Sequence, residues 1–226
     1  MRMGQSLASS RLWIVALVLL TYLAVASAVL LPYADVKGWT YPFLMAASTG
    51  FLALGLLTKP WQTTSDRWMF SGLMFCWLGD FFGPSNFALG AGLFLLAHVL
   101  FVIAFIMSCL NRRNSLWATL LTLPSLGILA WLLPQVEESM RVLVIAYTLV
   151  ITVMVITAAG TRRLVFVGAV IFYISDIFVA RWRFVDHDPI NALICYPLYY
   201  TACLILAYSL FQSNATATSE KNPELA

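Results

Sequence analysis

Two aspartates inside apolar stretches are the residues of this chain best suited to chemistry. The sequence has ten acidic residues, but only Asp80 and Asp176 lie within long hydrophobic segments. An acid buried in a membrane is costly, so such a residue is a functional candidate by default. Burial favours the neutral form of a carboxyl group, and two neighbouring acids can share one proton. One can then act as a general acid while the other acts as a general base.

An acid–base pair of this kind suits a bond that breaks after protonation and attack by water. Glycosidases divide these roles between two carboxyl groups when they cleave acetals through an oxocarbenium-like state. A vinyl ether is a close chemical relative, because protonation of its β-carbon also gives an oxocarbenium ion. Addition of water then gives a hemiacetal, which collapses to an aldehyde and an alcohol.

The two aspartates lie in segments of similar pattern that are 96 positions apart. Each segment begins with an arginine and reaches its aspartate 13 positions later. The coincident pairs are Arg67/Arg163, Phe70/Phe166, Gly72/Gly168, Asp80/Asp176 and Phe82/Phe178. Only five of 16 positions match, so both duplication and chance agreement between apolar segments remain open. We adopt duplication, which predicts two halves that cross the membrane in the same direction.

Apolar segments of about twenty residues recur along the whole chain and must position these acids. The sequence is 62% hydrophobic and 10% charged, whereas a soluble domain averages about 25% charged residues. We predict an all-α polytopic membrane protein with eight transmembrane helices, because about 20 apolar residues of helix cross a bilayer core. The predicted spans are 12–32, 39–57, 67–82, 87–110, 115–133, 141–159, 164–181 and 191–211. They form one domain, residues 1–211, with repeat halves at 12–110 and 115–211, and residues 212–226 should be a disordered polar tail.

The basic residues are distributed unevenly between the two sides of the predicted bundle. Nine of the 13 collect on the side that holds both termini, and the other four are Lys37, Arg141, Arg181 and Arg183. This asymmetry predicts that both termini are cytoplasmic. The net charge of +3 is therefore mostly a topology signal, and we expect membrane lipids as partners but no nucleic acid.

Further polar side chains are expected near the depth of the two acids, which lie roughly 20 Å along their helices from the arginines. His98 in span four and the pair Tyr199–Tyr200 in span eight fall near this level. A buried histidine can equally be a structural hydrogen-bonding group, and tyrosines often mark the membrane interface. Arg181 and Arg183 follow span seven on the outer side, where they could bind phosphate or extend to the interface.

Other reaction classes fit the sequence less well. The chain has only two histidines, His98 and His187, so a three-histidine zinc site is impossible. A metal site of Asp80, Asp176 and His98 is conceivable, but we expect neither metal nor cofactor. The sequence has no Gly-x-Ser-x-Gly motif and no phosphate-binding glycine loop. The Gly-x-Gly-Asp motif of intramembrane aspartyl proteases is only partly met by residues 77–80.

A set of short motifs occurs in fixed order between residues 78 and 200, and the similarity that they carry covers roughly residues 39–211. These are Leu78-Gly79-Asp80; Leu89-Gly90 followed by Gly92, Phe94, Ala97 and His98; Gly168-Ala169 followed by Phe172, Ser175 and Asp176; and Tyr199-Tyr200. Their order and spacing resemble the YhhN family, which includes the lysoplasmalogenases. The family's Gly-Asp and Ser-Asp positions correspond to Asp80 and Asp176. The resemblance implies hydrolysis of the vinyl ether of a lysoplasmalogen to a fatty aldehyde and glycerophosphocholine or glycerophosphoethanolamine.

Together with the chemistry of the residues, this reaction predicts roles for the remaining candidates. One aspartate would protonate the alkene carbon and the other would activate water, while His98 and a tyrosine orient the acids or the glycerol. Arg181 or Arg183 would hold the phosphate, and the protein would lie in a bacterial inner membrane. Cys203 and Phe101 stand where the family often has Gln and Tyr, which leaves the head group open. A proton-coupled transporter or flippase of a lipid-like substrate is the alternative, because parallel repeats with membrane acids also occur in transporters.

Overall fold

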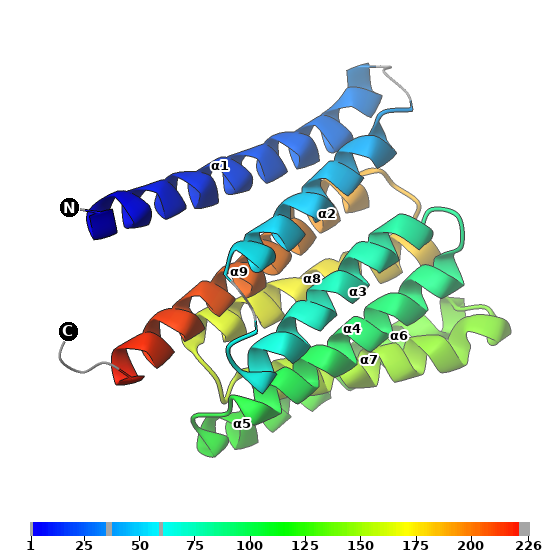
Figure 1. The fold of residues 1–226 in the computed structure, drawn as a ribbon. Coiled ribbons are helices and arrows are strands. Elements are labelled where there is room, and N and C mark those ends of the chain that lie inside the picture. Colours follow the sequence, from blue (N-terminus) through cyan, green and yellow to red (C-terminus); the bar gives the residue numbers. More distant parts are fainter. Residues whose placement is uncertain (1, 35–37, 59–60, 222–226) are drawn as a thin grey trace.

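The computed structural model describes residues 2–34, 38–58 and 61–221, and their side chains at 12–33, 38–58 and 61–211. This part of the chain is helical and contains no strand (Figure 1). The α-helices are α1 (Arg2–Leu30), α2 (Thr40–Leu57), α3 (Thr64–Phe82), α4 (Phe87–Met107), α5 (Arg112–Ala118), α6 (Thr122–Leu132), α7 (Glu138–Ala158), α8 (Arg163–Phe184) and α9 (Ile190–Lys221). Three short 3₁₀ segments are η1 (Leu31–Ala34), η2 (Thr119–Leu121) and η3 (Leu133–Gln135). The predicted all-α class is confirmed.

Seven segments within the described residues are long and apolar enough to cross a membrane, which indicates an integral membrane protein. They are 12–33, 40–57, 87–107, 112–135, 138–158, 163–184 and 190–211. Helix α3 is absent from this group, since its 19 residues include Asp66, Arg67 and Asp80. It nevertheless runs alongside α4 through the bundle (Figure 1). That α3 is an eighth membrane-spanning helix, beside these seven, therefore stays a prediction.

The fifth predicted span is interrupted rather than continuous. It consists of α5, η2, α6 and η3 in succession. Pro124 lacks an N–H and cannot donate to the Leu120 carbonyl one turn earlier, which accounts for a break in the α-helical hydrogen bonding near residues 119–121. Pro134 lies in η3, where the segment ends. The sequence correctly located this segment but not its break.

Two predicted ends differ from the structure. Helix α8 continues to Phe184, so Arg181 and Arg183 lie in its last turn rather than after it. Helix α9 continues to Lys221, whereas residues 212–226 were expected to be disordered. The segment 212–221 contains no proline or glycine, and its Gln, Ala, Glu and Lys residues have high helix propensity. Residues 222–226 lie outside the described part of the chain.

The helix contacts of the first predicted half correspond to those of the second. Helix α3 lies along α4 and α8 lies along α9, while α2 contacts α9 and α7 contacts α4. At the α3–α4 contact, a Cβ on Gly90 would lie 2.5 Å from the Cα of Gly83, so small residues permit this close approach. The second helix of each predicted half thus contacts the last helix of the other half. The parallel repeat itself remains a prediction.

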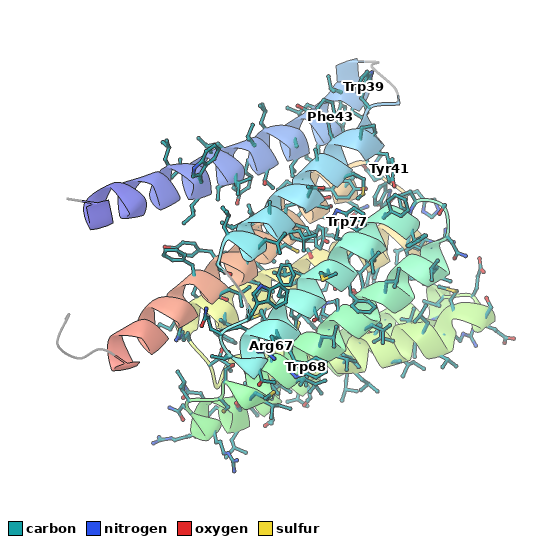
Figure 2. All side chains as sticks on the ribbon, viewed as in Figure 1. Trp39, Tyr41, Phe43, Arg67, Trp68 and Trp77 are labelled. Atoms are coloured by element: carbon teal, nitrogen blue, oxygen red, sulfur yellow. The ribbon has the colours of Figure 1, made fainter. Side chains whose placement is uncertain are left out.

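Several labelled aromatic side chains and Arg67 lie near the starts of two helices (Figure 2). Trp39, Tyr41 and Phe43 lie around the start of α2, and Arg67 and Trp68 lie at the start of α3, at the opposite end of the bundle. Such residues are typical of the membrane–water interface. The aspartates of the predicted site lie between these ends.

Candidate active site

Asp80 is held by hydroxyl groups from two other helices. Its Oδ2 accepts hydrogen bonds from Ser48 Oγ of α2 at 2.5 Å and from the Tyr199 hydroxyl of α9 at 2.8 Å. Within the described residues, no hydrogen bond reaches Oδ1, and the residue is partly exposed. One carboxyl oxygen is therefore fixed while the other is free to meet a substrate or water.

Ser48 is itself fixed by its surroundings. The side chain is fully buried, and its Oγ lies 2.9 Å from the Leu44 carbonyl and 3.1 Å from the Tyr200 hydroxyl. The Tyr200 hydroxyl donates to the same Leu44 carbonyl at 2.9 Å. Tyr200 therefore supports Ser48 rather than contacting Asp80 directly.

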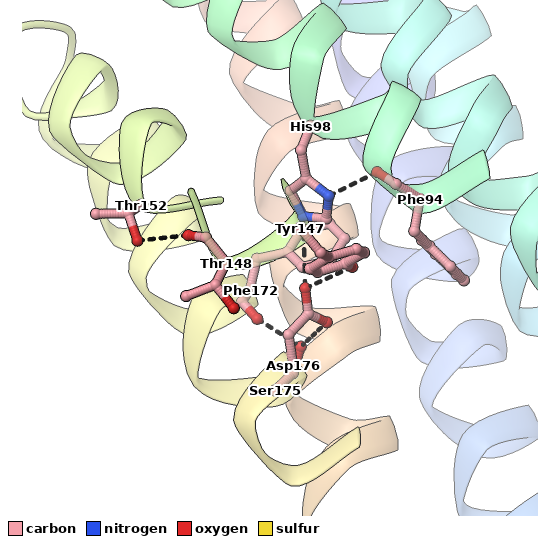
Figure 3. Close-up of polar contacts among 8 residues, drawn as sticks. All are labelled: Phe94, His98, Tyr147, Thr148, Thr152, Phe172, Ser175 and Asp176. Atoms are coloured by element: carbon pink, nitrogen blue, oxygen red, sulfur yellow. Dashed lines mark hydrogen bonds and ion pairs between the residues drawn. The ribbon is translucent and has the colours of Figure 1, made fainter. Parts of the chain in front are cut away.

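Asp176 has a different set of partners (Figure 3). Its Oδ2 accepts a hydrogen bond from the Tyr147 hydroxyl of α7 at 2.8 Å and lies 3.5 Å from Nε2 of His98 on α4. Ser175 Oγ lies 3.5 Å from Oδ1 but donates more closely, at 2.7 Å, to the Phe172 carbonyl. The Asp176 side chain keeps 14% of its surface exposed, so it is not fully buried.

His98 is buried and its orientation is set by the backbone. Its Nδ1 lies 2.6 Å from the Phe94 carbonyl oxygen, which can only accept, so Nδ1 carries a hydrogen. The rings of Phe172, Tyr147 and Phe101 surround the imidazole at centroid distances of 4.8, 5.2 and 6.3 Å. This arrangement directs Nε2 toward Asp176 (Figure 3).

Aromatic rings connect the residues around Asp80 with those around Asp176. The Phe172 ring lies 4.8 Å from His98 and 5.3 Å from Tyr199, centroid to centroid. Phe94 also packs edge-on against Tyr199 at 5.7 Å. The partners of Asp80 thus adjoin the partners of Asp176 in the apolar interior of the bundle. Such an interior excludes bulk water and strengthens the interactions of developing charge.

The predicted candidates fall into two groups. The first group lies at the two carboxyl groups: Tyr199 contacts Asp80, and His98 lies near Asp176. Tyr200 does not contact either aspartate directly but contacts Ser48, which donates to Asp80. Arg181 and Arg183 lie farther along α8, roughly 7–11 Å beyond Asp176 by helical rise. Arg181 pairs with Asp186 at 3.2 Å, and the Arg183 guanidinium lies 4.9 Å from the centre of the Phe87 ring.

The sequence reasoning missed Ser48 and Tyr147, the direct partners of the two aspartates. It also passed over Asp66, which is buried in the first turn of α3. The Asp66 N–H donates to Thr63 at the start of that helix, and its Oδ2 has no hydrogen-bond partner in the described residues. Within the same residues, no three His, Cys, Asp or Glu side chains are grouped as metal ligands.

Comparison with known proteins identifies the family. A profile of the YhhN family matches residues 36–210. The chain belongs to the YhhN family. Among curated relatives, Lysoplasmalogenase TMEM86B of Rattus norvegicus is 30% identical over 84% of this YhhN protein and 91% of its own length. Lysoplasmalogenase TMEM86B of Mus musculus is 28% identical over 82% and 92%, and Lysoplasmalogenase of Mycobacterium tuberculosis is 26% identical over 84% and 66%. No solved structure gives a significant match.

Proposed function

We propose that this YhhN-family protein is a lysoplasmalogenase that hydrolyses the vinyl ether bond of a lysoplasmalogen within the membrane. The products would be a fatty aldehyde and glycerophosphocholine or glycerophosphoethanolamine. The relatives' names support the reaction. The observation that carries the proposal is the pair of aspartates, each with one oxygen held by a hydroxyl from another helix. The carboxyl groups are thereby oriented before a substrate binds, as general acid–base catalysis requires.

The proposed reaction needs only these two groups and water. One carboxyl group protonates the β-carbon of the alkenyl chain and leaves an oxocarbenium ion on the neighbouring carbon. The other takes a proton from the attacking water, which gives a hemiacetal. The hemiacetal then collapses as the glycerol oxygen gains a proton and the new hydroxyl loses one.

The bundle offers surroundings for each part of this substrate. The apolar helices suit the hydrocarbon chain, and Arg181 or Arg183 at the end of α8 could bind the phosphate, because a guanidinium group matches its oxygens. A helix rise of roughly 7–11 Å separates these arginines from Asp176, which is comparable to the reach of a glycerol phosphate from its ether bond. With both termini in the cytoplasm of a bacterial cell, this end would face the outer surface.

The packing also supports the parallel four-plus-four repeat of eight spans. Asp80 on α3 is held by α2 and α9, and Asp176 on α8 is held by α7 and α4. Each acid thus uses the preceding helix of its own half and the last helix of the other half. A parallel duplication with a single shared site accounts for this correspondence.

The test is to incubate the purified protein in lipid nanodiscs with a 1-alkenyl lysophosphatidylcholine and measure free aldehyde and glycerophosphocholine. The 1-acyl lysophosphatidylcholine of equal chain length is the matched control. We expect equal amounts of both products from the alkenyl lipid alone. Transfer of the lipid across vesicle membranes without aldehyde release would instead support the transporter, and would contradict the proposed reaction.

A further inference from the structure

His98 Nε2 is buried without a hydrogen-bond partner among the described residues and faces Asp176 Oδ2, so a proton between these two atoms would favour their approach. The Phe94 carbonyl fixes the imidazole hydrogen on Nδ1, so Nε2 of a neutral ring is an acceptor. It lies 3.5 Å from Asp176 Oδ2, which is also an acceptor when the carboxyl group is ionised. Two facing acceptors repel one another. A proton on either Nε2 or Oδ2 turns this repulsion into attraction.

The surroundings favour the carboxyl group as the carrier of that proton. A proton on Nε2 would create an imidazolium inside a fully buried pocket lined by Phe101, Phe172 and Tyr147. Separated charges in such an interior are costly unless additional hydrogen bonds stabilise them. A proton on Asp176 keeps both groups neutral, and the Tyr147 hydroxyl can still donate to the same carboxyl group.

Asp80 has the opposite surroundings. Ser48 and Tyr199 both donate to its Oδ2, and no acceptor is among its hydrogen-bond partners in the described residues. Hydrogen bonds to an ionised acceptor are roughly twice as strong as those between neutral groups. The two hydroxyl donors therefore stabilise the carboxylate form of Asp80.

We infer that Asp176 is the general acid and Asp80 the general base of this site. Tyr147 and His98 are positioning residues for the acid, and Ser48 and Tyr199 are positioning residues for the base. This assignment rests on the proposed function, because it names the roles within that reaction. One part of the assignment does not depend on the substrate: in the resting protein, Asp176 holds a proton and Asp80 does not.

The proton balance closes with this assignment. Asp176 gives its proton to the β-carbon, and Asp80 then takes one proton from the attacking water. When the hemiacetal collapses, Asp80 returns that proton to the departing glycerol oxygen while Asp176 takes the proton of the new hydroxyl. Both groups end in their starting forms, and one water molecule has been consumed.

Infrared spectroscopy of the resting protein at neutral pH tests the assignment without substrate. A protonated carboxyl group gives a carbonyl stretching band that shifts in D₂O. The band should disappear in Asp176→Asn and persist in Asp80→Asn. If Asp176→Asn fails to fold, Tyr147→Phe should shift the band and Tyr199→Phe should leave it unmoved, because Tyr147 donates to Asp176 whereas Tyr199 donates to Asp80. Loss of the band in Asp80→Asn, or no such band in the wild type, would overturn the assignment.

Deuterium exchange tests the same roles during reaction. In D₂O, Asp80→Asn should still protonate the β-carbon but activate water poorly, so recovered lysoplasmalogen should carry deuterium at that carbon. Asp176→Asn should recover unlabelled lipid. Exchange in Asp176→Asn would overturn the assignment. Absence of aldehyde from the wild type would contradict the proposed function instead, and the infrared result would stand separately.

Discussion

Gly79 precedes the proposed base, and alanine at this position should disturb the site through a defined steric contact. A Cβ on Gly79 would lie 2.7 Å from Cε2, 2.8 Å from Cδ2 and 2.9 Å from Cζ of Phe94. Carbon atoms in favourable contact lie about 3.5–4.0 Å apart. The Phe94 ring would therefore have to move by about 1 Å.

Both stability and activity should respond to this displacement. Overpacking of a filled interior typically costs about 1–3 kcal/mol of unfolding free energy. The Phe94 ring packs against Tyr199 at 5.7 Å, and Tyr199 donates to Asp80. A misplacement of about 1 Å can reduce a catalysed rate by about 100-fold. We expect Gly79→Ala to lower turnover by about that factor, a larger effect than instability alone explains.

The assay combines SDS titration in mixed micelles, for stability, with aldehyde release, for turnover. Gly92→Ala is the matched control, because nothing lies within 4 Å of a Cβ at this helical glycine. It should leave activity unchanged and raise stability by about 0.5–1 kcal/mol through helix propensity. Adding Phe94→Leu to Gly79→Ala should recover part of the lost stability. Equal stability and activity of Gly79→Ala and Gly92→Ala would refute the steric argument.

Two further predictions concern positioning and binding. Tyr147→Phe removes a hydrogen bond to Asp176 worth about 1–2 kcal/mol, so turnover should fall roughly 5- to 30-fold. The control Tyr173→Phe, on α8 outside the site, should turn over like the wild type. An equal loss of turnover in both variants would contradict the positioning role of Tyr147. Arg181→Gln should raise KM about tenfold with kcat unchanged if the guanidinium binds phosphate, whereas Arg141→Gln should change neither. A fall in kcat at constant KM would argue against phosphate binding by Arg181.

The predictable part of the fold was the part with the strongest local signal. Long apolar runs located the spans, because a membrane requires apolar helices of a definite length. Helix α3 carries this signal less clearly, because its predicted span is short and the helix includes Asp66, Arg67 and Asp80. The interruption near residues 119–121 and the helical segment 212–221 depend on local hydrogen bonding. Hydropathy does not report such details.

The site was predictable where its residues were rare in their surroundings. Acids and histidines are uncommon inside membranes, so Asp80, Asp176 and His98 were visible from the sequence alone. Ser48 and Tyr147 were not, since serines in spans often bond the carbonyl one turn earlier and tyrosines are common at the membrane interface. Ser48 lies eight residues after the start of α2 and Tyr147 nine after the start of α7. The 96-residue offset pairs them with Val144 and Phe51, so comparison of the two halves does not single them out.

The central claim is that two carboxyl groups perform the hydrolysis together. The most direct measurement compares aldehyde release by the wild type, Asp80→Asn, Asp176→Asn and Asp66→Asn, each first shown to be folded. Asp66 is the matched control, because it is buried on α3 but lies outside the site. Loss of either catalytic group should lower turnover by about 10²–10⁴-fold, while Asp66→Asn should stay close to the wild type. Turnover within tenfold of the wild type in folded Asp80→Asn or Asp176→Asn would contradict the account.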